Sequence, residues 1–109
     1  MNKGYDFDGV LTTGRFKPEP GDCIITGRTW KDAELTRIEM GAMGILNIPI
    51  YFMPPIMKVP TGENGLIMTG MWKAIIIDAC ELDEYFEDDE VQYRTIINNI
   101  QGETIITKV

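Results

Sequence analysis

The residues with the clearest potential for chemistry are Asp6 and Asp8, two carboxylates separated by one residue and followed by Gly9. Alternate side chains of a β-strand point to one face, so both carboxylates would leave a strand end in the same direction, and Gly9 would permit a sharp turn. Two like charges this close need a counter-charge to stay ionised, and a divalent cation with oxygen ligands supplies one. The sequence therefore predicts a cation site here, with a solvated turn between two strands as the alternative.

Comparable polar groups occur at three other places in the chain: the run Thr26-Gly27-Arg28, Lys73, and the pair Asp88 and Asp89. The first and the last of these follow short apolar segments, and the lysine lies at the start of a predicted helix. In open parallel sheets, ligands bind outside the carboxyl ends of the strands. We therefore expect all these groups to meet the two early aspartates at one edge of a sheet.

The elements that would position these groups are strands and helices in alternation. Periodicity and breaker residues predict strands over 2–8, 22–26, 48–53, 84–87 and 103–109, and helices over 30–43, 71–82 and 91–100. The run 75–77 has strand propensity as well. This alternation favours an α/β fold, a three-layer, doubly wound and mostly parallel sheet with helices on both faces. A length of 109 residues suggests a single domain, 1–109.

Local signals add expectations about the connections. Thr29 suits the N-cap of the helix over 30–43, and Gly44 suits its C′ position. The apolar face of that helix would hold Trp30, Ala33, Leu35, Ile38 and Ala42. Residues 9–21 have the composition of a loop, with room for a hairpin through 11–16. Residues 54–70 are irregular, and we expect short strand pieces or a lid there.

Composition excludes several classes of function. The net charge of −7, from 17 acidic and 10 basic residues, argues against general nucleic-acid binding. The chain has no histidine, so Ser-His-Asp and Cys-His catalysis are excluded. Cys23 and Cys80 lie among apolar neighbours, which favours free thiols in a reducing cytoplasm. No apolar run approaches the roughly 18 residues of a membrane span, and the N-terminus lacks the apolar core of a signal peptide.

The order of the polar motifs resembles that of the haloacid dehalogenase (HAD) superfamily of phosphotransferases. An apolar strand ending in Asp-x-Asp-Gly is matched by residues 6–9, and a strand ending in threonine is matched by Thr26. A lysine near a helix start is matched by Lys73, with Lys58 as a rival, and an acidic pair after a strand is matched by residues 88–89. The resemblance covers residues 5–89 and implies a minimal HAD core without a substantial cap domain.

The resemblance implies a magnesium-dependent phosphatase. Asp6 would be the nucleophile that forms an aspartyl-phosphate, and Asp8 would act as general acid and then as general base. Lys73 would pair with Asp6 and the transferred phosphoryl group.

The same resemblance implies the groups that bind metal and phosphate. Mg²⁺ would be held by the Asp6 side chain, the Asp8 backbone carbonyl and the Asp88 side chain, with Asp89 in support. Thr26 and the backbone around Gly27 would hold a phosphate oxygen. Arg28 would contact the substrate or form an ion pair with a local acid.

The sequence does not decide whether the substrate is a nucleotide or another phosphoester. An open site of this kind tends, in the family, to accept large phosphoesters.

A non-catalytic HAD-like domain that binds metal or a protein partner is the main alternative. A receiver-like domain fits the order of the acids less well. Cysteine-phosphatase chemistry is disfavoured because the spacing from Cys23 to Arg28 is one residue short of that family's phosphate loop. Methionines around residues 53–71 leave a homodimer open as well.

Overall fold

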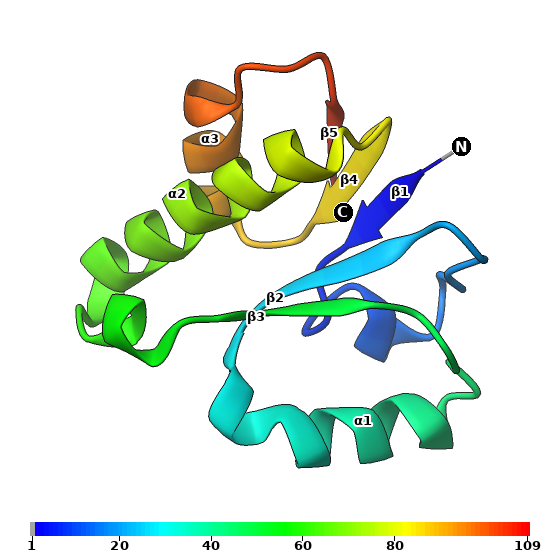
Figure 1. Cartoon of the computed structure of the whole chain (residues 1–109). Coiled ribbons are helices and arrows are strands. Elements are labelled where there is room, and N and C mark those ends of the chain that lie inside the picture. Colours follow the sequence, from blue (N-terminus) through cyan, green and yellow to red (C-terminus); the bar gives the residue numbers. More distant parts are fainter. Residues whose placement is uncertain (1) are drawn as a thin grey trace.

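The computed structural model describes residues 2–109 and contains one sheet of five parallel strands (Figure 1). The strands are β1 (Lys3–Tyr5), β2 (Cys23–Thr29), β3 (Ile50–Met53), β4 (Glu84–Glu87) and β5 (Ile105–Lys108). Their order across the sheet is β3-β2-β1-β4-β5, and every neighbouring pair is parallel. The chain therefore builds outward from β1 in one direction and then, from β4, in the other. The expected α/β fold with a parallel sheet is confirmed.

Helices cover both faces of this sheet. Figure 1 shows α1 (Ala33–Ala42) on one face and α2 (Gly62–Cys80) and α3 (Glu90–Asn99) together on the other. Short 3₁₀ helices precede α1 at Trp30–Asp32 and α2 at Pro55–Lys58, and a third lies at Leu11–Thr13. Within residues 2–109, no helix combines the length and the apolar character that crossing a membrane requires.

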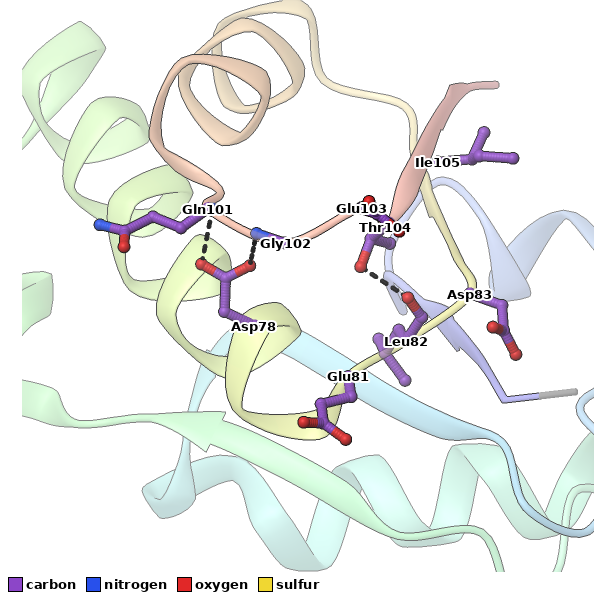
Figure 2. A pocket seen from close by; sticks show the side chains of 9 residues that line it. All are labelled: Asp78, Glu81, Leu82, Asp83, Gln101, Gly102, Glu103, Thr104 and Ile105. Atoms are coloured by element: carbon purple, nitrogen blue, oxygen red, sulfur yellow. Dashed lines mark hydrogen bonds between the residues drawn. The ribbon is translucent and has the colours of Figure 1, made fainter.

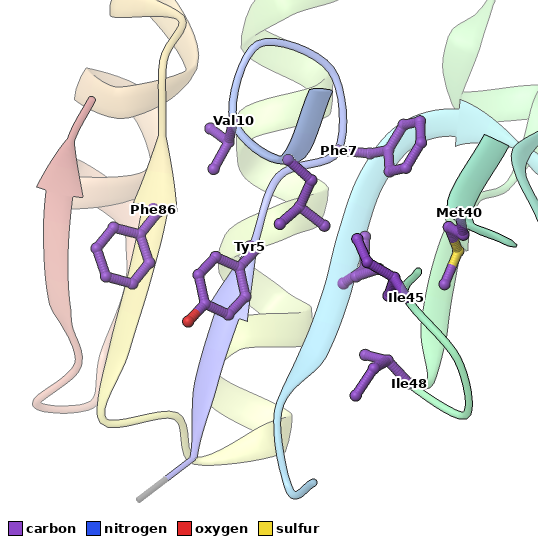
Figure 3. Packing of buried hydrophobic residues seen from close by; sticks show 9 residues of the cluster. Tyr5, Phe7, Val10, Met40, Ile45, Ile48 and Phe86 are labelled. Carbon is purple, nitrogen blue, oxygen red and sulfur yellow. The ribbon is translucent and has the colours of Figure 1, made fainter. Parts of the chain in front are cut away.

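Two apolar clusters hold the layers together, one on each face. Figure 3 shows the cluster on the α1 side, where Tyr5 of β1 and Phe86 of β4 stack with ring centroids 5.0 Å apart. The opposite cluster contains Ile25, Tyr85 and Trp72, the last of these from α2. Alternate residues of β2 and β4 thus enter opposite clusters, as the twofold repeat of a strand buried on both faces requires.

The expectation of short strand pieces within residues 54–70 was wrong, because most of this segment is helical. They form the 3₁₀ helix Pro55–Lys58 and the first half of α2. The glycines that suggest a break serve close contacts instead. A Cβ on Gly65 would lie 2.5 Å from the Pro60 carbonyl oxygen, and one on Gly70 would lie 2.7 Å from Cβ of Thr95 on α3.

The predicted apolar face of the helix over 30–43 was also wrong. Leu35 and Ile38 are exposed, whereas Thr36 and Met40 are buried. The first three residues form a 3₁₀ turn, and the α-helix begins only at Ala33. Thr29 precedes that turn without capping it through its side chain, while Gly44 has the left-handed backbone expected after a helix, with φ of 76°.

Candidate active site

Asp6 lies directly after β1, at the carboxyl edge of the sheet. Its N–H donates to the carbonyl of Phe86 at 3.1 Å, which extends the pairing of β1 with β4 by one residue. Its side chain is buried, and Oδ1 accepts hydrogen bonds from the Phe7 N–H at 2.9 Å and from Lys73 Nζ at 3.0 Å. Both contacts fall on Oδ1, so no N–H group of residues 2–109 is bonded to Oδ2.

Lys73 reaches this carboxylate from the second half of α2 and not from a helix start, as the sequence had indicated. Its ammonium also donates to Glu87 Oε1 at 2.8 Å, and the two side chains are only 1% and 0% exposed. Oε2 of Glu87 accepts the N–H of Asp89 at 3.2 Å. The lysine is thus fixed between two buried carboxylates, each of which comes from the end of a central strand.

Glu87 is a site residue that the sequence analysis missed. It ends β4 and lies two positions after Tyr85, so both side chains point to the face covered by α2 and α3. The signal available in the sequence was this alternation, because a glutamate on the buried face of a strand requires a cationic partner. Glu87 stands in a run of acidic residues, so its place on the buried face of the strand was not recognised.

Burial sets the protonation of these groups. It raises the pKa of Asp6 to about 7, with Lys73 opposing the increase and Glu87 adding to it. Burial on its own would lower the pKa of Lys73, but the two adjacent carboxylates outweigh it and raise that pKa. The pKa of Asp88 is raised by burial and by the neighbouring Asp6. The site therefore holds more negative charge than the single lysine neutralises, which favours proton or cation uptake.

Three carboxylates are placed to bind a metal ion together. Oxygens of Asp6, Glu87 and Asp88 all lie within 4.8 Å of one another. Carboxylate oxygens are the ligands that hard divalent cations such as Mg²⁺ select. Gly9 makes room for this arrangement, because it has φ of +80° and a Cβ there would lie 1.9 Å from Asp88 Oδ2.

The side chains of Asp8 and Asp89 have partners within the protein, although the metal role expected of Asp8 was that of its backbone carbonyl. Asp89 Oδ2 accepts the N–H of Gln92 at 2.8 Å and caps the start of α3. The Asp8 carboxylate is not one of the three clustered carboxylates, and β1 ends at Tyr5 with a turn after Asp6. Asp8 and Asp6 therefore do not extend from one strand face. Asp8 is paired instead with Arg28, through Nε to Oδ2 at 2.9 Å and Nη2 to Oδ1 at 2.8 Å.

Most of the predicted residues border one pocket of about 240 Å³ at the carboxyl edge of the sheet. Its lining consists of Asp6, Asp8, Gly27, Arg28, Lys58, Lys73, Asp88, Asp89 and Gln92. Thr26 is absent from this lining: it is buried, and its hydroxyl accepts the backbone N–H of Arg28 at 3.1 Å. That contact accompanies the irregular pairing of β2 with β3 between residues 26 and 29, which brings Gly27 to the pocket.

Lys58, the rival lysine, also borders this pocket. It is exposed, and its ammonium donates to the Gly27 carbonyl at 2.6 Å. It makes no ion pair with the buried acids among the described residues. Lys73 is therefore the lysine of the buried centre, and Lys58 is a second cation at the rim.

A larger hollow of about 750 Å³ lies at the amino-terminal ends of β4 and β5 (Figure 2). Its acidic residues include Asp78, whose two carboxylate oxygens accept the N–H groups of Gln101 and Gly102 at 2.9 and 3.0 Å. Asp78 thus anchors the loop between α3 and β5. The buried lysine and carboxylates described above lie at the smaller pocket. The volume of a pocket therefore does not identify the candidate site in this protein.

The two cysteines lie outside the smaller pocket and are free thiols. Cys23 is buried at the start of β2, and burial raises its pKa to about 12. A thiol that stays protonated at neutral pH is a poor nucleophile. This observation agrees with the expectation that cysteine-phosphatase chemistry is disfavoured.

Fold and site together define an α/β protein with a parallel sheet and a buried lysine–carboxylate centre at its carboxyl edge. Comparison with protein-family models, with curated proteins and with solved structures found no match to this chain. The residues themselves are therefore the ground for an assignment of function.

Proposed function

We propose that this protein is a magnesium-dependent phosphatase that works through an aspartyl-phosphate on Asp6, as its resemblance to the HAD superfamily implies. The observation that carries the proposal is the meeting of Asp6, Lys73 and Asp88, from three distant parts of the chain, at the carboxyl edge of β1 and β4. This is the edge at which parallel α/β sheets bind ligands.

The contacts of Asp6 suit a nucleophile. Oδ1 is held by the Phe7 N–H and by Lys73, so the carboxylate has a fixed orientation while Oδ2 is the oxygen left for attack on phosphorus. The Lys73 ammonium, 3.0 Å from Oδ1, stabilises the negative charge of a phosphoryl group transferred to that carboxylate. A bound Mg²⁺ would neutralise charge on the phosphoryl oxygens. Asp6, Glu87 and Asp88 are the residues that would hold it.

The rim of the pocket offers contacts for the phosphate. Gly27 has no side chain, and a Cβ there would lie 2.9 Å from Cγ2 of Thr69 and 3.6 Å from Lys58 Nζ. Gly27 thus allows the close approach of Thr69, and both Gly27 and Lys58 line the pocket, where Lys58 supplies a positive charge. Gly27 keeps the phosphate-binding role expected for it from the sequence, and Lys58 would take the part expected of Thr26, which is buried outside the pocket.

The test is a panel of phosphorylated compounds assayed with and without Mg²⁺, on the wild-type protein and on Asp6→Asn. We expect Mg²⁺-dependent release of phosphate by the wild type and a loss of at least about 10³-fold in Asp6→Asn, because the amide cannot attack phosphorus. Glu34→Gln is the matched control, since Glu34 is an exposed acid on α1.

The same assay separates the enzyme from a non-catalytic metal-binding domain. Mg²⁺ that raises the melting temperature without turnover of any compound would favour the non-catalytic alternative, because a ligand bound only by the folded state stabilises it. Residual turnover in Asp6→Asn equal to that of Glu34→Gln would contradict the aspartyl-phosphate mechanism.

A further inference from the structure

The two cysteines of the chain meet in space, although they are far apart in the sequence. Cys23 begins β2 and points to the face covered by α2, since Cys23 and Ile25 both enter the apolar cluster on that face. Cys80 is the last residue of α2 and packs against the same cluster. The helix layer therefore brings one thiol over the strand that carries the other.

Both cysteine side chains line a hollow of about 250 Å³ at the amino-terminal ends of the central strands. Its lining also contains Gly21 and Pro49, which precede β2 and β3, and Leu82, which precedes β4. This edge of the sheet is opposite the candidate active site, and the hollow shares no residue with the pocket there. A role for the two cysteines therefore does not depend on the proposed phosphatase.

The Cys80 side chain lies beside that of Cys23. Burial raises the pKa of the Cys23 thiol to about 12, and the adjacent Cys80 adds to this increase. Cys80 also adjoins Tyr51 of β3, and this contact is the main cause of the raised pKa of the Tyr51 phenol. A disulfide joins Cβ atoms that are only about 3.5–4.5 Å apart, so neighbouring thiols are the ones that can be joined with little movement of the backbone.

The two thiols differ in their access to solvent. Cys23 is only 6% exposed, and a thiol that stays protonated among apolar groups attacks slowly. Cys80 is half-buried at the end of its helix, so a small reagent in solvent can reach its sulfur. Cys80 is thus the thiol for a first reaction with such a reagent, and Cys23 is placed to complete that reaction within the molecule.

We propose that Cys23 and Cys80 are a site of reversible oxidation, at which a low-molecular-weight disulfide such as oxidised glutathione converts the two thiols into one intramolecular disulfide. The Cys80 thiolate attacks one sulfur of the reagent, whose S–S bond breaks to release a glutathione thiolate. Cys23 then loses its proton and attacks the Cys80 sulfur, which releases the second glutathione thiolate. The protein gives up two electrons and two protons, and the reagent takes them up as two thiols.

The first test treats the folded chain with oxidised glutathione, unfolds it, blocks the remaining thiols with a maleimide and determines its intact mass. We expect the wild type to carry neither maleimide nor glutathione, because its two sulfurs have joined. A stable glutathione adduct, a disulfide-linked dimer or two maleimide-labelled thiols as the main product would each overturn the proposal.

Two variants test the order of the steps. Cys23→Ala should stop at the mixed disulfide, with one glutathione bound to Cys80. Cys80→Ala should keep its single thiol free for maleimide, because Cys23 is buried. Equal uptake of glutathione by the two variants would contradict the assignment of Cys80 as the first thiol to react.

A second measurement needs only the wild type. The disulfide would close a long loop that contains α1, β3 and α2, and it would therefore restrict the unfolded chain. We expect oxidation to raise the melting temperature by about 5 °C or more and dithiothreitol to reverse the increase. An internal disulfide that leaves the melting temperature unchanged or lowers it would show that joining the sulfurs strains the fold, and would overturn the inference that the fold places them for this reaction.

Discussion

Lys73 and Glu87 form a buried ion pair, with Nζ and Oε1 2.8 Å apart, although one residue belongs to α2 and the other ends β4. The same ammonium lies 3.0 Å from Oδ1 of Asp6. One cation thus joins the helix layer to the carboxyl ends of two adjacent strands. The two partners of Lys73 are fixed by the sheet. Lys73 can reach them only while α2 packs in its present position, so the site depends on that packing.

Replacing Lys73 by methionine should destabilise the protein strongly, because Asp6 and Glu87 would remain buried without a cation. Removing one partner of a buried pair costs about 3–5 kcal/mol in the free energy of unfolding. Urea unfolding at about pH 8 measures this loss, with the exposed Lys31→Met as the control. A loss in Lys73→Met no greater than in Lys31→Met would show that the pair contributes nothing.

Stability should depend on pH through Asp6. Its pKa is raised by burial to about 7, so the folded state holds this proton more tightly than the unfolded chain, in which an aspartate titrates near 4. Without Mg²⁺, the contribution of Asp6 to the free energy of unfolding therefore falls as the pH rises from about 4 to about 7. The raised pKa of Asp88 acts in the same direction.

Mg²⁺ should reverse this trend, since it competes with protons for the same oxygens. We expect a few millimolar Mg²⁺ to raise the melting temperature by more at about pH 8 than at about pH 5.5. Thermal unfolding at both pH values measures the difference, and Asp6→Asn should reduce it. An equal increase at both pH values would place the cation elsewhere on the protein.

Gly9→Ala should remove Mg²⁺ binding, because the added Cβ would occupy the position of the Asp88 carboxylate, 1.9 Å from Oδ2. Gly14→Ala is a close control: its φ of +76° matches the +80° of Gly9, but nothing lies within 4 Å of its Cβ. Both variants bear the left-handed backbone strain of about 1–2 kcal/mol. Only Gly9→Ala should also lose the melting-temperature increase with Mg²⁺, and retention of that increase would contradict the proposed ligand set.

The parts of the fold that the sequence predicted well are those in which local and tertiary preferences agree. The strand over 84–87 is apolar at its centre and ends in acids, and β4 has these same bounds. Asp6, Lys73 and Asp88 could be named because each follows or faces a strand end. All strands of a parallel sheet end at the same edge, so these three residues meet at one pocket there.

Other features depended on contacts that no local pattern encodes. Glycines in 62–70 suggested a break, yet Gly70 serves the close approach of α2 to Thr95. Thr36 faces inward because Arg28 binds it, against the apolar preference of its neighbours. Glu87 was hidden among other acids, since only the tertiary structure shows which one meets Lys73.

Gly70→Ala gives the last prediction, which links helix packing to the site. A Cβ at this position would lie 2.7 Å from Cβ and 3.0 Å from Cγ2 of Thr95, so α2 must move away from α3. Lys73 lies one turn further along α2 and would be drawn from Asp6 and Glu87. We expect a loss of roughly 1–3 kcal/mol from overpacking, together with weaker Mg²⁺-dependent stabilisation.

Gly41→Ala on α1 is the matched control, because Gly41 is also helical and nothing lies within 4 Å of its Cβ. Alanine there should raise the free energy of unfolding by about 0.5–1 kcal/mol, since it restricts the unfolded chain and favours the helix. Opposite signs for the two glycines in urea unfolding would locate the effect in the contact between α2 and α3. A stabilising Gly70→Ala would mean that α2 can shift freely, and the fixed position of Lys73 would then need another cause.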